Sequence, residues 1–251
     1  MDRDTDLGGS IDAFPATRCS VILSTASQDD HVRKQAFETL VAVYWKPVYK
    51  YLRMQSKLSN EDAKDLTQAF FTRALEKGFF ERYDPKKARF RTFLRVCLDG
   101  FTVSEWRAAH RIKRGGEVAI QSMDFSGAEG EILRQDVADR HDPDEAFRQE
   151  WLRGLFSLAV EDLRSHCEAE NKQVHFQLFE RYDLEGPDST EAPNYAQLGV
   201  VFGLPVTQVT NYLAYARRQF RVLLLERLCA TTGSEEEFQL EARQLLGGNL
   251  R

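Results

Sequence analysis

Apolar residues recur at helical spacing along most of the chain, and no segment alternates convincingly as a β-strand does. Residues 32–54 carry an apolar face with Pro47 inside it. Ser59 and the acidic residues after it predict the start of a second helix, which Gly78 ends. A turn at Asp84-Pro85 precedes helical spacing over 88–111. These patterns predict three or four packed helices between about residues 32 and 113.

Helical spacing resumes beyond an acidic stretch. Asp142-Pro143 predicts the start of a helix that continues through Leu163, and a second helical run covers 174–182. A short helix over 195–202, a turn at 203–205 and a helix over 206–228 have the helix-turn-helix layout, and a plain helical hairpin explains the pattern equally. Residues 234–246 predict a short amphipathic helix. We therefore predict an all-α fold of two small helical domains joined by an acidic linker.

Charge is segregated along the chain. Residues 86–114 hold nine basic and two acidic side chains (9 − 2 = +7), whereas residues 117–145 hold two basic and nine acidic ones (2 − 9 = −7), in a chain of net charge −5. A positive field with aromatic rings inside it favours a nucleic acid whose bases become accessible. The alternative is a solvated basic helix face over an aromatic core. Phe90 and Phe93 are each predicted to belong to that core.

Composition argues against several other classes of protein. The four cysteines lie far apart with no C-x-x-C pair, which predicts reduced thiols rather than a disulfide framework or a zinc site. The histidines have no metal-ligand spacing, the nearest candidate being His166-Cys167 with His175, and no glycine-rich phosphate loop is present. We therefore expect no enzyme, metal or cofactor. The absence of a signal peptide and of a long apolar run predicts a cytoplasmic protein with no membrane partner.

The order of these parts resembles the extracytoplasmic-function (group IV) sigma factors, the small two-domain initiation factors of bacterial RNA polymerase. Residues 37–114 resemble the second conserved region of that family and residues 147–228 the fourth. The block EDAKDLTQAFF at 61–71 is similar to the family's acidic "DAEDLVQETF" helix, which grips a coiled coil of the largest polymerase subunit. The resemblance assigns polymerase binding to Asp62, Asp65, Leu66, Gln68 and Phe71.

The same resemblance divides the chain into five parts. Residues 1–30 form an N-terminal extension, and residues 31–114 a region 2-like helical bundle for polymerase binding and promoter melting. Residues 115–145 are an acidic linker, which threads the polymerase cleft in the family and which composition alone explains as a flexible tether. Residues 146–230 form a region 4-like helix-turn-helix domain. Residues 231–251 form a tail with a short helix.

The segment RFRTFL at 89–94 is similar to the family's "FRxWL" segment, and EWRAAHR follows at 105–111. In the family these pieces melt the promoter and read the minus-ten element on the non-template strand, so a flipped base is expected near residues 98–102. Gly100 and Ser104 replace the family's usual Asn and Asp. The expected DNA-binding residues are Lys86, Lys87, Arg89, Arg91, Arg95, Trp106, Arg107, His110, Arg111, Lys113 and Arg114.

In the fourth-region match, the family's "VKSRLHRAR" becomes VTNYLAYAR at 209–217. Three usually basic positions are therefore Thr210, Tyr212 and Tyr215, and fewer charges release fewer counterions on DNA binding. We expect weaker minus-thirty-five recognition, or recognition through direct polar contacts. The expected DNA-binding residues here are Thr207, Gln208, Thr210, Asn211, Tyr212, Tyr215, Arg217 and Arg218.

The function that the resemblance implies is that of a sigma factor, which binds core polymerase and directs promoter recognition, melting and initiation without catalysis of its own. Its expected partners are core RNA polymerase and promoter DNA, both duplex and melted non-template strand. Because family members are commonly silenced by a partner protein, an anti-sigma or other regulatory protein is a further expected partner. The alternative is a stand-alone helix-turn-helix regulator that binds duplex DNA, which leaves the 61–71 block unused.

Overall fold

The computed structural model describes residues 21–109, 123–134, 142–185 and 193–246. Within these ranges all regular structure is helical and no strand occurs, so the prediction of an all-α fold is confirmed for them. No helix in the same ranges combines the length and the apolar character that crossing a bilayer requires.

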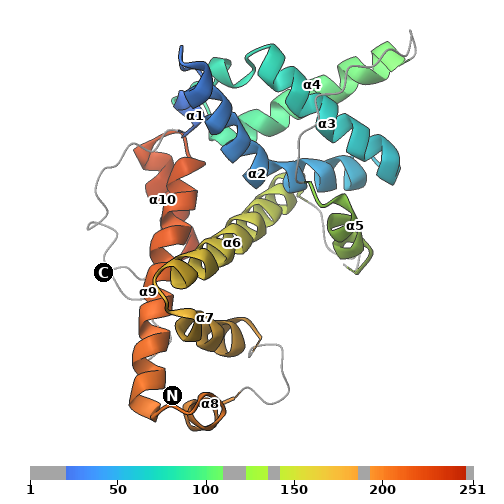
Figure 1. The fold of residues 1–251 in the computed structure, drawn as a ribbon. Coiled ribbons are helices and arrows are strands. Elements are labelled where there is room, and N and C mark those ends of the chain that lie inside the picture. Colours follow the sequence, from blue (N-terminus) through green and yellow to red (C-terminus); the bar gives the residue numbers. More distant parts are fainter. Residues whose placement is uncertain (1–20, 110–122, 135–141, 186–192, 247–251) are drawn as a thin grey trace. The chain divides into compact units, whose positions relative to one another are not determined.

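The predicted helices are present, with boundaries close to those expected from the sequence (Figure 1). Two further short turns, Phe80–Arg82 (3-10) and Glu180–Leu184 (π), connect helices. The helices are α1 (Val21–Ser24), α2 (Asp30–Met54), α3 (Asn60–Glu76), α4 (Phe90–Ala109), α5 (Phe125–Arg134), α6 (Pro143–Ala169), α7 (Gln173–Phe179), α8 (Tyr195–Phe202), α9 (Val206–Ala230) and α10 (Glu235–Leu245).

The described chain divides into two compact units. The first unit contains residues 21–155 and 228–241, and the second contains residues 156–227 and 242–246. The first unit therefore includes α5 and the first turns of α6, which lie in the predicted linker and at the predicted start of the region 4-like domain. The five predicted parts of the chain stay predictions.

The first unit has an aromatic core between α2, α3 and α4. Phe70 and Phe90 are fully buried, and their rings lie 5.5 Å from Phe101 and 5.4 Å from Tyr44 respectively. The predicted cap at Ser59 is present, because its hydroxyl accepts a hydrogen bond from the Asp62 amide at 3.1 Å. The prediction that Phe90 belongs to the core is confirmed, whereas Phe93 is only half-buried.

Helix α5 lies inside the acidic stretch and was not expected from the sequence. It packs against α2, where Glu129 bonds to the Arg53 guanidinium (2.5 Å) and Glu131 to the Lys46 and Lys50 ammonium groups (2.5 and 2.7 Å). Its ten residues include two glycines, which weaken helical propensity, so tertiary contacts stabilise it. Residues 125–134 therefore form a packed helix rather than the flexible tether that composition alone allows.

The second unit contains α6 from Phe156 onward, α7, α8, α9 as far as Arg227 and the last residues of α10. Leu163, Leu213 and Phe220 are among its buried side chains. Asn194 and Gln197 form a capping box at the start of α8, and Gly203 ends α8 with a positive φ of 66°. Gly199 packs against the turn that follows, since a Cβ there would lie 2.7 Å from the Leu204 carbonyl oxygen. Glycine at this position lets α8, the turn at 203–205 and α9 pack closely.

Among the cysteines that the structure describes, one differs from expectation. Cys97 is a half-buried free thiol and Cys167 a buried one, as predicted. Cys229 is disulfide-bonded, so the prediction that all four cysteines are reduced thiols is wrong at this residue. Separation along the sequence did not exclude this bond, because folding brings distant segments into contact.

Candidate nucleic-acid interface

The predicted polymerase-binding residues fall on two faces of α3. Asp62, Asp65 and Gln68 are exposed, and Leu66 is half-buried beside them. The Ser59 hydroxyl donates a hydrogen bond to the Asp62 carboxylate at 2.7 Å, which leaves the carboxylate at the surface. Asp65, Leu66 and Gln68 together give this face a mixed polar and apolar surface that suits a partner helix.

Phe71 is a correction to that set. Its side chain is fully buried, and its ring lies 5.3 Å from Phe70 and 6.4 Å from Phe37. A buried ring at this depth offers no surface to a partner. Phe71 therefore supports the exposed face of α3 from within the core, as helical periodicity requires of a residue on the face opposite Asp62.

Three of the predicted DNA contacts lie just before α4. Lys86 and Lys87 are exposed, and Lys87 lies 3.5 Å from the Asp84 carboxylate in a pair that solvent screens. Arg89 is 36% exposed. Lys86 and Lys87 can therefore reach a phosphate with little rearrangement of α4. The Arg89 guanidinium, in contrast, donates a hydrogen bond to the buried Glu241 carboxylate at 2.9 Å.

Arg91 and Arg95, in contrast, are engaged within the first unit. The Arg91 side chain is 11% exposed, pairs with Glu241 of α10 and lies over the Trp151 ring at 5.4 Å. Arg95 bonds to Asp99 at 3.0 Å and also pairs with Asp144. The charge that the sequence places on α4 is thus neutralised at these two positions, and neither guanidinium is a freely exposed phosphate anchor.

The remaining predicted contacts of this region are only partly covered by the described structure. Trp106 and Arg107 belong to α4, but their side chains are outside the described part. The residues His110, Arg111, Lys113 and Arg114 lie outside the described residues altogether. Their assignment to DNA stays a prediction.

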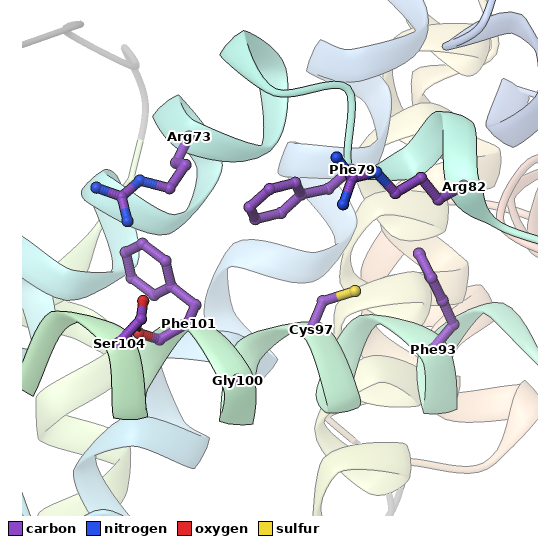
Figure 2. Close-up of a pocket in the computed structure, with 8 residues that line it drawn as sticks. All are labelled: Arg73, Phe79, Arg82, Phe93, Cys97, Gly100, Phe101 and Ser104. Carbon is purple, nitrogen blue, oxygen red and sulfur yellow. Dashed lines mark hydrogen bonds between the residues drawn. The ribbon is translucent and has the colours of Figure 1, made fainter.

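A pocket of about 250 Å³ opens where the sequence predicted the capture of a base (Figure 2). Figure 2 shows one wall formed by successive turns of α4 and the opposite wall by residues of α3 and the following turn. The lining is formed by Arg73, Phe79, Arg82, Phe93, Cys97, Gly100, Phe101 and Ser104. Gly100 has open space around its Cβ position, so its lack of a side chain leaves the pocket wider.

Cationic and aromatic groups meet in this pocket. The Arg73 guanidinium lies 5.3 Å from the centre of the Phe101 ring and 2.5 Å from the Glu105 carboxylate, and the Arg82 guanidinium lies 6.0 Å from the centre of the Phe79 ring. Burial raises the pKa of the Cys97 thiol, so the neutral form is favoured. The pocket offers flat apolar surfaces for a ring and guanidinium groups for an anion next to it.

The sequence predicted only the α4 side of this pocket. Arg73, Phe79 and Arg82 were not expected, because they lie 15 to 30 residues earlier in the chain and their approach to α4 depends on packing. The one available signal was composition, since two phenylalanines and an arginine lie close together over 79–82. That signal is weak without the helix that it faces.

In the second unit, the first turns of α9 expose several predicted contacts. Thr207, Gln208 and Asn211 are exposed, whereas the Thr210 hydroxyl is turned to the helix and donates a hydrogen bond to the Val206 carbonyl oxygen at 3.1 Å. Arg218 is exposed and lies over the Tyr215 ring at 5.8 Å. These residues, apart from Thr210, present polar groups on the outer face of α9.

Tyr212 and Tyr215 pack within the unit. The Tyr212 ring stacks on His175 with ring centres 3.8 Å apart. The Tyr215 hydroxyl lies 3.0 Å from the Lys172 ammonium and 3.1 Å from His166 Nε2. Both tyrosines are half-buried, so their rings support α9 and leave only their edges for a partner.

Arg217 is also committed to a partner inside the unit. Its guanidinium donates to both Asp183 carboxylate oxygens at 3.0 to 3.2 Å, and its side chain is 13% exposed. A bidentate pair of this kind holds the side chain in place. Arg217 therefore joins α9 to the turn after α7, and its assignment to DNA stays a prediction.

The histidines of the second unit contact a tyrosine rather than a metal-ligand set in the described structure. Among the described residues, no group of three or more His, Cys, Asp or Glu side chains is arranged to hold a metal ion. His166 and His175 flank Tyr215 instead, and burial lowers the pKa of His175, which favours its neutral ring. Comparison of the chain with protein-family models, with curated proteins and with solved structures gave no match in any of the three.

Proposed function

We propose that this chain is a promoter-specificity subunit of bacterial RNA polymerase, of the extracytoplasmic-function sigma type. It would bind core polymerase through α3, bind melted promoter DNA through the start of α4 and its pocket, and bind duplex DNA through α9. It carries out no covalent step itself. Its role is to stabilise the open state by binding a displaced strand, since unpairing a base costs a few kcal/mol.

One observation carries the proposal, namely the pocket formed by α3, the turn after it and α4. The resemblance to sigma factors places base capture at residues 98–102, and the pocket there is lined by three phenyl rings and two guanidinium groups. A base can stack on the rings while Arg73 or Arg82 contacts the phosphate beside it. Lys86, Lys87 and Arg89 lie at the N-terminal end of the same helix and can contact further phosphates of the strand.

The proposal is tested by run-off transcription with core polymerase over a library of upstream DNA regions. The chain is expected to direct initiation from a subset of templates that share a motif. Asp65→Arg is expected to abolish both transcription and co-purification with core polymerase, because it reverses charge on the exposed face of α3. Glu76→Arg makes the same charge change at the other end of α3 and is the matched control. Transcription that depends on neither the chain nor Asp65 would contradict the proposal.

The pocket has a separate test. Arg82→Ala is expected to weaken permanganate reactivity of promoter thymines, which reports strand opening, by about tenfold, equivalent to about 1.4 kcal/mol. Lys77→Ala removes an exposed basic residue at the end of α3 that does not line the pocket, and it should leave opening unchanged. Equal opening by the two variants would remove the pocket from the proposal.

A stand-alone DNA-binding regulator is the second candidate, and the α8–turn–α9 geometry favours it. The glycine-dependent turn and the exposed Thr207, Gln208 and Asn211 suit insertion of α9 in a major groove. Such a regulator binds a duplex site without polymerase. Sequence-specific retention of duplex fragments by the chain alone, together with no effect of Asp65→Arg in transcription, would favour this candidate.

A further inference from the structure

The carboxylate of Glu241, on α10, lies at the centre of three arginine side chains of the first unit. Its Oε1 atom accepts a hydrogen bond from Arg89 Nη1 at 2.9 Å and one from Arg91 Nη1. Its Oε2 atom lies 3.6 Å from Arg148 Nε on α6. The Glu241 side chain is fully buried, so these guanidinium groups replace its water. Three cations therefore converge on one anion.

A groove of about 400 Å³ runs beside this cluster. Its lining includes Lys87, Arg89 and Arg91 from the start of α4 and the segment before it, Asp144, Glu145 and Arg148 from α6, and Asp142 just before α6. The lining charges sum to 4 − 3 = +1, and the carboxylate of Glu241 brings the total to zero. Glu145 also pairs with Arg148 at 3.2 Å, and Asp144 pairs with Arg95. The Arg89–Arg91–Arg148 cluster is thus an anion site, and its occupant comes from the chain itself.

A second glutamate of α10, Glu237, fixes the position of Glu241 relative to the arginine cluster. The Glu237 carboxylate accepts hydrogen bonds from the backbone amides of Phe90 (3.2 Å) and Gly233 (2.8 Å) and from the Tyr83 hydroxyl (3.3 Å). These contacts attach the first turn of α10 to the start of α4. One helical turn later, Glu241 meets the arginine cluster, because residues four apart lie on one face of a helix.

A backbone phosphate and the Glu241 carboxylate can be bound by the same groups. Each carries about one negative charge, and each offers oxygens that accept paired hydrogen bonds from guanidinium groups. Arg89 and Arg91 belong to the segment for which DNA is the proposed ligand, whereas Arg148 was not among the expected contacts. We propose that Arg89, Arg91 and Arg148 form a phosphate site for a bound DNA strand, and that Glu241 occupies this site in the free chain.

The inference rests on the proposed function, since it takes DNA as the polyanion. Its consequence is competition within the chain. A strand phosphate can enter the cluster only when Glu241 leaves it. The apparent affinity of the free chain for DNA is therefore its intrinsic affinity multiplied by the fraction of molecules in which α10 is undocked. Arg148 then becomes a third phosphate contact, which adds about 0.7 to the salt slope for a single strand.

The test measures binding of a fluorescent single-stranded oligonucleotide to the full chain by anisotropy. Glu241→Gln keeps the size of the side chain and removes its charge, and it is expected to tighten binding about tenfold. Glu236→Gln removes the same charge from an exposed position of the same helix and should change affinity less than twofold. Arg148→Gln combined with Glu241→Gln is expected to cancel most of the gain.

The outcomes separate this inference from the proposed function. If the parent chain binds the oligonucleotide and a folded Glu241→Gln variant binds it no more tightly, the inference is overturned and the proposed function stands. If neither the parent chain nor the Glu241→Gln variant binds the oligonucleotide, alone or with core polymerase, the inference and the proposed function are both overturned. Should Glu241→Gln not fold, hydrogen exchange of α10 in the parent chain decides. Faster exchange over 235–241 on adding the oligonucleotide supports displacement, and unchanged exchange overturns it.

Discussion

The basic side chains of the first unit and the helix α9 of the second meet their partners in different ways. In the first unit, carboxylates from α5, α6 and α10 reach lysines and arginines of α2, of α4 and of the segment before α4 across 49 to 152 residues of sequence. On α9, Tyr212 stacks on His175 and the Tyr215 hydroxyl bonds to Lys172, so uncharged aromatic residues make the contacts there. A count of basic residues therefore overstates the free positive surface of the first unit.

The difference extends to burial. Lys50 is 1% exposed and bonds to Glu131 and to Glu150, which is itself 3% exposed, both at 2.7 Å. The ion pairs of the second unit are more open to solvent, as for Arg227 with Asp162, each 29% exposed. Buried pairs are sensitive to the loss of one partner, whereas solvent screens exposed ones. Substitutions of single charged residues and single glycines in each unit test this difference in burial.

The largest effect is expected for Lys50→Met, which leaves Glu150 buried without its ammonium partner. We expect the free energy of unfolding of the first unit to fall by about 3 to 5 kcal/mol. Lys50→Met with Glu150→Leu should recover most of that loss, because an apolar pair can replace a buried ion pair. Peptide-resolved hydrogen exchange in urea measures each unit separately, and a loss below about 1 kcal/mol for the single variant would show that the pair is not buried.

Gly199→Ala tests close packing in the second unit. The added Cβ would lie 2.7 Å from the Leu204 carbonyl oxygen, a backbone atom that cannot rotate away. We expect a loss of about 1 to 3 kcal/mol in the second unit, as overpacking typically costs. The same hydrogen-exchange measurement should place the loss over residues 193–204, and unaltered protection there would contradict the packing of the turn.

The contact between α5 and α2 should depend on pH. The hydrogen bond from Arg53 is the main cause that lowers the pKa of the Glu129 carboxyl in the folded protein. The charged carboxylate therefore stabilises the fold fully above the unfolded pKa of about 4.3. This stabilisation is lost as the pH falls through the lower pKa of the folded state. Glu129→Gln is expected to cost about 1 to 3 kcal/mol at pH 7.

The cost of Glu129→Gln should shrink as the pH of urea denaturation is lowered from 5 to 3. Glu61→Gln, at a side chain that is 78% exposed and pairs with Lys64 at the surface, serves as the control and should change stability little at either pH. A cost that is the same at pH 7 and pH 3 would mean that the charge of Glu129 does not hold α5.

The smallest effect is expected for Gly100→Ala, the counterpart of Gly199→Ala in the first unit. Gly100 is exposed on α4, and nothing lies within 4 Å of its Cβ position. Alanine should raise the free energy of unfolding by about 0.5 to 1 kcal/mol through helical propensity alone. Thermal unfolding of the variant measures this, and a loss of stability would show that the Gly100 backbone is more crowded than the structure indicates.

Local features of the chain were predictable, and features that join distant segments were not. The cap at Ser59, the end of α3 near Gly78 and the turn at Gly203 followed from residue types, because caps and turns depend on a few neighbouring residues. Helix α5 was missed, since its glycines and acidic residues resemble a linker until Lys46, Lys50 and Arg53 of α2 are placed beside them.

The candidate site divides in the same way. The sequence by itself determined that α4 carries arginines among aromatic rings and that α8 and α9 meet at a tight glycine turn, because a periodic pattern fixes which residues share a helix face. Only the tertiary structure decided that Arg73 and Arg82 face α4 across a pocket, that Phe71 is core, and that Glu241 neutralises Arg91. Burial and charge pairing depend on which segments meet in space, and ion pairs gain strength only where packing excludes water.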